Sequence, residues 1–424
     1  MVQMVQKFPA TETHTKTVNR SERLLIEMID TEAGFLALKT AWQALEKRDP
    51  EGTVFLSWNW LREAFRGKSG QWRILALRRA DAAQGYVCFF PMKYRLRWSK
   101  SRTELQSEIE AGGRLLWSEY TGFLCDPEWE SQSMRLMAER VQSLPWAWLS
   151  LRYEMSENRA RLFTEAFPAD KFSVSWKGYF INDGETDNLM CPQVELPDTF
   201  EAYLQTCISA KMRHKLRKPM STYLDTGEVR IREASTASFE QDLELILKFW
   251  SKRWKPIKGP KTTRLAAANY RRILTAAHRA GLLHMPVLWK DNRPLGVHGY
   301  ICDPEMKRMH FIVSGRNTEA SEPYIGNLLH GHSLRRSIEM GYGTYDFCHG
   351  NEAYKYSYGA KDKRANYFTI RRRGKAASSA RFDRIGVPGA MIRAAKYLHS
   401  GKPDRAAHVC RQMADMLQPK ASRL

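Results

Sequence analysis

Residues 341–359 hold the densest set of side chains in the chain that can take part in chemistry. Asp346, His349 and Glu352 can each accept a proton, and Lys355 adds a positive charge a few residues later. A general base must lie within hydrogen-bond reach of an attacking amine or hydroxyl, and a fixed cation stabilises a developing oxyanion. The stretch is therefore a candidate catalytic loop. The alternative is a polar surface loop that covers packed tyrosines.

This loop must be positioned by the elements on either side of it. Glycines at 341 and 343 end a helix predicted at about residues 324–340, and a short strand is predicted at 344–348. Chemistry in α/β folds gathers at strand ends and in the loops after them. Hydrophobic periodicity predicts further helices at about 31–45, 58–65, 130–143, 199–218, 238–252 and 265–280. It predicts strands at 72–78, 86–98, 115–124, 146–153, 284–290, 295–302, 308–315 and 367–372.

The two halves of the chain show the same order of elements. A strand, a turn and a second strand over residues 73–94 correspond to those over 285–302, and each half then continues with a helix and another strand. We therefore predict an α/β (mixed α+β) fold made of two copies of one domain, each with a central sheet flanked by helices. Glycines and prolines at 178–197 mark the boundary between them. The predicted divisions are a disordered lead-in (1–23), an N-terminal domain (24–180), a C-terminal domain (181–374) and a basic helical tail (375–424).

Charge and composition narrow the classes of function. The chain has 424 residues with 67 Lys and Arg against 46 Asp and Glu, a net charge of +21 that favours anionic partners. No apolar run is long enough for a transmembrane helix, and the first 20 residues do not resemble a signal peptide. Seven scattered cysteines form no CxxC pair, so we predict free thiols and no metal site. These features predict a cytoplasmic protein.

Four short motifs carry a resemblance to a known family. They are Asp346-Phe-Cys-His-Gly350 with Glu352, Tyr354, Lys355 and Gly359; Phe55-Leu-Ser-Trp58; the basic run Lys211–Lys218; and Phe249 with Arg253 and Trp254. In order and spacing they resemble the CelD-like (cellulose-biosynthesis) acetyltransferase family of the GNAT superfamily. The resemblance spans about residues 25–372, although no single motif is highly specific.

The resemblance implies two tandem GNAT-like domains, similar in arrangement to the Fem-type aminoacyltransferases. It implies direct acyl transfer from a thioester to an amine or hydroxyl, with no tightly bound cofactor and acetyl-CoA or another acyl-CoA as cosubstrate. Asp346 or Glu352 would act as base or orienter, His349 as a lesser candidate for base, and Lys355 as an anion contact. The donor's pyrophosphate would lie where a helix begins. The residues implied there are Arg316, Asn317, Gly326 and Asn327.

One departure from the family pattern concerns this donor site. A GNAT phosphate loop has closely spaced glycines, whereas the first glycine after Arg316 is Gly326. Glu319 and Glu322 would also repel phosphate. Because Fem-type enzymes use aminoacyl-tRNA, tRNA remains an alternative donor, and the net charge of +21 suits it.

Substrate binding is assigned to cationic and aromatic side chains of the second half. The basic run predicts an anion clamp, or alternatively a solvated helix face. The candidate substrate contacts are Lys211, Arg213, Arg217, Arg253, Trp254 and Tyr354. His298 and His310 fall in predicted strands and are assigned to the sheet interior, although a strand side chain can also point into a cleft.

Two functional hypotheses follow. The first is an acyltransferase that acts on a sugar or envelope-polysaccharide precursor. The second is a non-catalytic scaffold of an exopolysaccharide or cellulose system, whose basic tail docks on membrane-associated synthesis machinery at the inner face of the membrane. The sequence has no helix-turn-helix, zinc-finger or basic-zipper pattern that would indicate a specific DNA binder.

Overall fold

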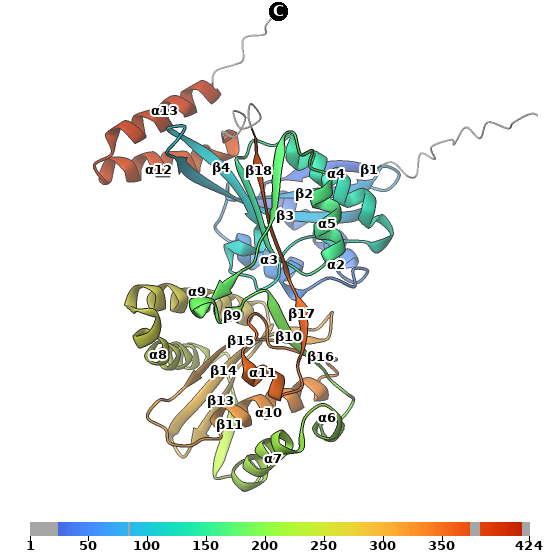
Figure 1. The fold of residues 1–424 in the computed structure, drawn as a ribbon, viewed down its shortest axis with the longest axis vertical. Coiled ribbons are helices and arrows are strands. Elements are labelled where there is room, and N and C mark those ends of the chain that lie inside the picture. Colours follow the sequence, from blue (N-terminus) through green and yellow to red (C-terminus); the bar gives the residue numbers. More distant parts are fainter. Residues whose placement is uncertain (1–23, 84, 374–381, 418–424) are drawn as a thin grey trace, which may run out of the picture.

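The computed structural model describes residues 24–83, 85–373 and 382–417. Over these residues the chain forms two lobes along the long axis of the molecule, each built on its own sheet (Figure 1). No helix of the described residues is long and apolar enough to cross a membrane. The two sheets with flanking helices confirm the predicted mixed α/β class.

The first lobe has a sheet with the strand order β1-β2-β3-β4-β6-β18-β7, and β5 pairs with β3. Its strands are β1 (Leu24–Ile29), β2 (Trp72–Arg79), β3 (Tyr86–Ser99), β4 (Glu104–Ala111), β5 (Leu124–Cys125), β6 (Trp148–Glu154), β7 (Phe172–Trp176) and β18 (Asn366–Arg372). Its helices are α1 (Glu32–Ala37), α2 (Lys39–Glu46), α3 (Trp58–Phe65), α4 (Glu130–Gln142) and α5 (Glu157–Glu165).

The second lobe has a sheet with the strand order β11-β13-β14-β15-β16-β10-β17, and β12 pairs with β14. Its strands are β10 (Met190–Glu195), β11 (Val229–Glu233), β12 (Leu283–His284), β13 (Pro286–Lys290), β14 (Arg293–Asp303), β15 (Arg308–Arg316), β16 (Thr344–Asp346) and β17 (Lys361–Arg364). Its helices are α6 (Phe200–Thr206), α7 (Ala210–Pro219), α8 (Phe239–Lys258), α9 (Pro260–Arg279), α10 (Ile325–Glu339) and α11 (Ala353–Ser357). A small hairpin of β8 (Phe180–Ile181) and β9 (Thr186–Asp187) lies between the lobes in sequence.

The same unit occurs in both lobes. In each lobe an antiparallel meander of three strands, β2-β3-β4 or β13-β14-β15, is followed by a helix, α4 or α10. The helix is followed by a strand that is parallel to the last strand of the meander. That strand is β6 in the first lobe and β16 in the second. A parallel pair requires a crossover connection, and the helix supplies it. The predicted duplication of one α/β unit is thus present.

Among the assignments that differ from the structure, two concern strands of the first lobe. Residues 366–372 fall in the predicted second domain, yet they form β18, which lies between β6 and β7 of the first sheet. A division at residue 374 therefore does not follow the division between the sheets. The strand predicted at 115–124 is mostly turn and loop, with only Leu124–Cys125 in a strand. In both cases strand pairing is set by distant partners, which local periodicity does not encode.

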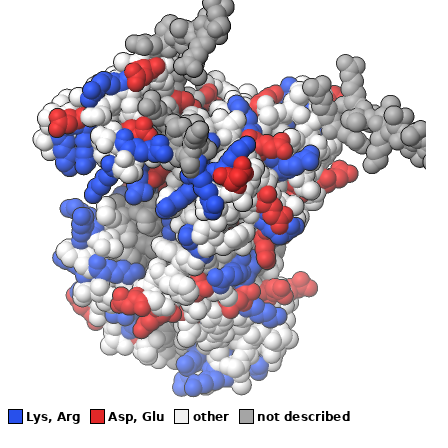
Figure 2. All heavy atoms as spheres, turned by 45° about the horizontal axis from the view of Figure 1, so that its top comes forward, with Lys and Arg blue, Asp and Glu red and all other residues white. Residues whose placement is uncertain are grey.

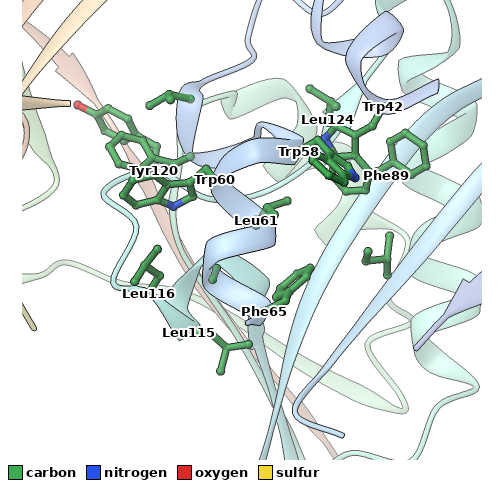
Figure 3. Packing of buried hydrophobic residues seen from close by; sticks show 14 of the residues in the cluster. Trp42, Trp58, Trp60, Leu61, Phe65, Phe89, Leu115, Leu116, Tyr120 and Leu124 are labelled. Atoms are coloured by element: carbon green, nitrogen blue, oxygen red, sulfur yellow. The ribbon is translucent and has the colours of Figure 1, made fainter. Parts of the chain in front are cut away.

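The core of the first lobe is aromatic and continues toward the second lobe. Trp42, Trp58 and Trp60 are buried around α3, and each indole N–H donates to a backbone carbonyl or to a serine hydroxyl. Figure 3 shows these rings with Phe65 and Phe89, and with Tyr120 at the side of the cluster away from Phe89. The same cluster includes buried side chains of α9. The tryptophans drawn in this view thus belong to a packed core that joins the lobes.

The basic tail contributes two helices, α12 (Val387–His399) and α13 (Pro403–Leu417). Their buried face packs against Leu105 of β4 and against Leu96 and Trp98 of β3. Gln412 exchanges two hydrogen bonds with the backbone of Leu105. The helices predicted in this region therefore dock on the extended β3–β4 hairpin. The rest of the predicted tail, residues 375–381 and 418–424, lies outside the described residues, as does the predicted lead-in 1–23.

Glu154 at the end of β6 leads to a prediction about pH. Its buried carboxyl accepts hydrogen bonds from the amides of Ser156 and Phe123, and burial raises its pKa to about 8. The folded chain therefore keeps a proton that the unfolded chain releases near pH 4.5. The stabilisation that this proton provides is complete below pH 4.5 and is lost as the pH rises through 8. We expect Glu154→Gln to make the protein more stable than the wild type at pH 9, by on the order of 2 kcal/mol.

Urea unfolding of both proteins at pH 6 and pH 9 measures this difference. Glu157→Gln changes an exposed carboxyl on the adjacent helix and serves as the matched control. An equal loss of stability with pH in the wild type and in Glu154→Gln contradicts the prediction.

Candidate functional site

The candidate site begins where two parallel strands of the second lobe separate. β15 and β16 are paired over only three residues, and the last pair is His310 with Asp346. Beyond that pair β15 continues to Arg316 beside β14, whereas the chain after Asp346 turns into a loop. Ligands of α/β sheets bind in the crevice outside the carboxyl ends of such strands. The predicted catalytic loop starts at this point.

A register shift lies next to the separation. Gly299 pairs with Val313 and Tyr300 pairs with Phe311, so Ile312 is an extra residue on β15. A bulge of this kind leaves the extra residue outside the regular ladder. Such irregularities are frequent beside active sites.

The Asp346 carboxylate accepts four hydrogen bonds. Its fully buried carboxylate accepts from the hydroxyl of Tyr120 (2.7 Å), the amide of Gln193 (3.1 Å), Nδ1 of His310 (3.0 Å) and the backbone amide of Cys348 (2.7 Å). Burial opposes the negative charge, but His310 and these other donors outweigh it and lower the pKa of Asp346. A carboxylate held in this way joins the two lobes and orients His310. It is a poor proton acceptor.

His349 lies at the same junction between the lobes. Its Nδ1 is 2.7 Å from the Oε2 atom of Glu119, and its ring stacks on Tyr153 with centroids 3.7 Å apart. The edge of the Tyr120 ring meets the imidazole from another side. Contacts from the first lobe thus fix this imidazole although it belongs to the second.

His310 and His349 share one arrangement and differ in exposure. Each ring has one nitrogen on a carboxylate, and the Nε2 atom of each has no hydrogen-bond partner among the described residues. The His310 side chain is 0% exposed, whereas the His349 side chain is 9% exposed and its partner Glu119 is 19% exposed. Both Nε2 atoms are buried, but only the His349 ring and its partner Glu119 are partly exposed, so His349 is the better candidate for a base that must reach its substrate.

Lys355 and Glu352 hold the loop in place. The buried Lys355 ammonium donates to the carbonyls of His349 (2.6 Å) and Gly350 (2.8 Å) and lies 2.9 Å from Glu352. Two of its N–H groups thus donate to the loop backbone, and its charge is paired with Glu352. The Glu352 side chain is 39% exposed and approaches Gly350, whose φ is +95°. The structure assigns Lys355 the role of fixing the backbone around His349.

The start of α10 lies next to the candidate loop. The helix begins at Ile325 without a side-chain cap, and the space beside Gly326 is open. Asn327 accepts a hydrogen bond from Tyr358 (2.9 Å), which links the helix start to the end of the candidate loop. Uncapped amides at a helix start are a site for anions.

Residues 316–322, just before α10, are held by backbone hydrogen bonds and ion pairs. The Arg316 guanidinium donates to the carbonyls of Ala320 and Glu322, and Asn317 bonds to the backbone of Pro294 and Leu295. Glu319 pairs with Lys252 and Glu322 pairs with Arg293. The two carboxylates expected to repel phosphate therefore each have a cationic partner.

The comparisons with known proteins concern this part of the chain. Residues 210–356 match the family model of the acetyltransferase (GNAT) domain. The chain carries a GNAT acetyltransferase domain. The match covers about a third of the chain and includes β15, β16, α10 and the candidate loop. It does not extend to the narrower CelD-like family, and no curated protein matches the chain.

Solved structures resemble the whole two-lobed chain. The crystal structure of FemX aligns with a TM-score of 0.56 at 11% identity, over 81% of this chain and 96% of that chain. The C-terminal domain of a putative lysylphosphatidylglycerol synthetase from Agrobacterium fabrum aligns at 0.46 and 10% identity, over 81% and 94%. A tandem GNAT protein from the clavulanic acid biosynthesis pathway aligns at 0.37 and 9% identity, over 82% and 99%. At these identities the likeness concerns fold alone, and the FemX alignment supports it.

The GNAT domain does not bring every predicted substrate contact to the crevice. Arg213 donates to the carbonyls of Leu204 and Gln205, and Arg217 pairs with Glu201, so both bind α6. Lys211 is exposed at the start of the same helix, α7, which packs on α10.

The remaining predicted contacts lie on two different elements. Arg253 and Trp254 are on α8, whose buried side chains pack on the sheet face that carries Val297 and Val313. The α10 side chains pack on the opposite face, against Phe311 and Leu295. Tyr354, by contrast, is in α11 of the candidate loop, is 45% exposed, and lies near Phe347.

The first lobe supplies groups that the sequence analysis did not select. Glu119 orients His349, Tyr120 donates to Asp346, and the guanidiniums of Arg114 and Arg152 lie over the Tyr153 ring. Glu119 and Tyr120 fall in a stretch interpreted as a strand. No local pattern links them to His349, because the contact forms only when the lobes meet.

Proposed function

We propose that this protein is an acyltransferase that moves an acetyl or other acyl group from acyl-CoA to an amine or hydroxyl of a sugar or envelope-polysaccharide precursor. One observation carries the proposal. The region that matches the GNAT domain contains two diverging parallel strands with a carboxylate-held imidazole, His349, just beyond them. The CelD-like motifs support the polysaccharide part of the proposal.

The donor would lie along β15. Beyond His310 one edge of this strand is paired with β14, and β16 no longer pairs with the other edge. An unpaired strand edge can bind an extended, amide-containing chain, and the pantetheine arm of coenzyme A is such a chain. Its phosphates would reach the uncapped start of α10 at Gly326 and Asn327. A backbone N–H at the bulge around Ile312 is suited to polarise the thioester carbonyl.

The chemical step would use His349 as general base. The acceptor's nitrogen or oxygen attacks the thioester carbonyl carbon while its proton moves to Nε2 of His349. The carbon–sulfur bond then breaks, and the coenzyme A thiolate leaves and takes up a proton. Glu119 on Nδ1 stabilises the imidazolium that forms. In this scheme Asp346 and Lys355 position the cleft and the loop, and neither of them carries the proton.

The acceptor would enter from the first lobe. Trp117 is 43% exposed and has a φ of +60°, an unfavourable conformation for a residue other than glycine. It lies two residues before Glu119 and beside the Arg114 guanidinium. An exposed indole next to a half-buried guanidinium suits a sugar ring that carries an anionic group.

An aminoacyl-tRNA donor is the second candidate, and a basic hollow favours it. The hollow, of about 730 Å³, lies between the β3–β4 hairpin and β18 in the first lobe. Its cationic lining residues are Arg97, Lys100, Arg102, Arg371 and Arg372. Figure 2 looks toward this end of the molecule and shows Lys and Arg side chains gathered there. Trp98 and Trp148 add stacking surfaces to the hollow.

Calorimetric titration with acetyl-CoA tests the donor directly. We expect binding in the micromolar range and a loss of about tenfold or more in affinity for Gly326→Asp, because the new carboxylate repels the donor phosphates. Gly343→Asp is the matched control, since Gly343 also has open space around it and lies beyond the other end of the helix. No binding of acetyl-CoA together with salt-dependent binding of charged tRNA would replace the acyl-CoA donor by aminoacyl-tRNA. Equal affinity of both glycine variants contradicts the placement at α10.

A further inference from the structure

Three ligand-type side chains that the acyl-transfer scheme does not use meet on the second lobe. They are Glu233 at the end of β11, His284 in β12 and His332 in α10. One oxygen of the Glu233 carboxylate is 3.1 Å from Nδ1 of His284, and the other is 3.0 Å from Nε2 of His332. One ligand atom from each of the three residues lies within 4.8 Å of the other two. The histidine rings are nearly parallel, 17° apart, and both present a nitrogen to the carboxylate.

These distances match the spacing that a tetrahedral metal site needs. Zinc binds imidazole nitrogen and carboxylate oxygen at about 2.0–2.2 Å, which places neighbouring ligands about 3.3 Å apart. Two imidazoles and one carboxylate are a ligand set typical of zinc sites that keep a fourth position for water. Magnesium and calcium prefer oxygen ligands alone.

The His284 ring is held in place in the way that a metal-binding histidine usually is. Its second nitrogen, Nε2, is 3.1 Å from the hydroxyl of Ser333, a fully buried residue of α10. A hydrogen bond to the far nitrogen fixes the ring and is the usual partner of a metal-bound histidine. His284 is 8% exposed, whereas the side chains of His332 and Glu233 are 27% and 44% exposed. An ion can therefore reach the site from solvent.

We propose that Glu233, His284 and His332 bind one zinc ion, with its fourth position occupied by water. The ion connects α10 to β11 and β12, three elements that are far apart in the sequence. It therefore stabilises the second lobe and takes no part in acyl transfer. No metal site was predicted from the sequence, because these ligands are not closely spaced along the chain. Here each ligand comes from a different element.

Metal content and thermal unfolding of the full chain test the proposal. The protein is stripped with a chelator, dialysed against zinc chloride, and its zinc is counted per chain. We expect one zinc per chain, a higher unfolding temperature with zinc than without it, and no comparable effect of magnesium chloride. Glu233→Gln and His332→Gln should each weaken zinc binding by about tenfold or more. His399→Ala, an exposed histidine on α12, is the matched control and should leave binding unchanged.

Two outcomes would overturn the assignment. One is a wild-type protein that retains no zinc at micromolar concentration. Glu233 then acts only as the hydrogen-bond acceptor of the two histidines. The other is zinc binding that persists in Glu233→Gln and His332→Gln, which would place the ion elsewhere, for example at His310, Asp346 and Cys348, whose ligand atoms also lie within 4.8 Å of one another. The Glu233 side chain is 44% exposed, so Glu233→Gln is expected to fold. It therefore still tests the site if His332→Gln does not fold.

Discussion

Replacing His349 by glutamine is expected to lower kcat for acyl transfer by about a hundredfold to ten-thousandfold while the KM for the donor stays within about threefold. The imidazole Nε2 has no partner among the described residues and is the only proton acceptor that our scheme assigns to the acceptor group. The donor contacts that we propose on β15 and α10 do not involve this ring. Steady-state rates with acetyl-CoA and an amino-sugar panel measure both constants. Glu119→Gln should give a smaller loss, because the amide still accepts a hydrogen bond from Nδ1 but carries no charge.

The imidazole of His310 provides an internal control for this prediction. His310 has the same geometry against Asp346, with its own unpaired Nε2, but its side chain is 0% exposed. If the exposure argument is correct, His310→Gln changes stability more than kcat. A variant set in which His310→Gln abolishes turnover and His349→Gln retains it within about threefold would transfer the role of base to His310. Thermal unfolding of both variants separates a loss of chemistry from a loss of fold.

Much of the fold could be predicted because its elements have a strong local signal. The helix predicted at 58–65 is α3, and the strands predicted at 72–78 and 86–98 are β2 and β3 within one residue at each end. Their buried faces repeat at helical or strand period, which the sequence displays directly. β4 was not predicted, because only Leu105 and Ile109 on its buried face are large and apolar and three of its eight residues are glutamate, which weakens the strand signal. The partner of β18 was also unpredictable, because it is set by the meeting of distant segments.

The sequence pointed to the second-lobe residues of the candidate site but not to those of the first lobe. The spacing of Asp346, His349 and Lys355 pointed to this candidate loop, because all three lie within one short stretch. Their chemical roles depend on neighbours from the first lobe. Tyr120 lowers the capacity of Asp346 to act as a base, and Glu119 prepares His349 for it. Contacts of this kind depend on how two folded lobes meet, and that is a property of tertiary packing.

A buried ion pair in the first lobe gives the largest expected effect on stability. The Arg159 guanidinium forms a two-bond contact with Asp49 (2.7 and 2.8 Å), and its Nε donates to Glu130 (2.8 Å). Burial disfavours the charge on Arg159, but the two carboxylates outweigh burial and raise its pKa. We expect Arg159→Met to destabilise the protein by about 3–5 kcal/mol, because Asp49 remains buried without a cation. Urea unfolding measures the change.

The same helix offers the matched control for this prediction. Arg161 and Glu165 form an ion pair one turn apart on α5, with side chains 50% and 58% exposed. An exposed pair of this kind contributes about 0.3–0.5 kcal/mol, so Arg161→Met should be nearly neutral. The two substitutions remove the same side chain two residues apart and differ only in burial and partners. Equal effects would mean that water reaches Asp49. A large difference would show that the cost arises from leaving a buried charge unpaired, and Arg159→Met with Asp49→Leu should then recover part of the loss.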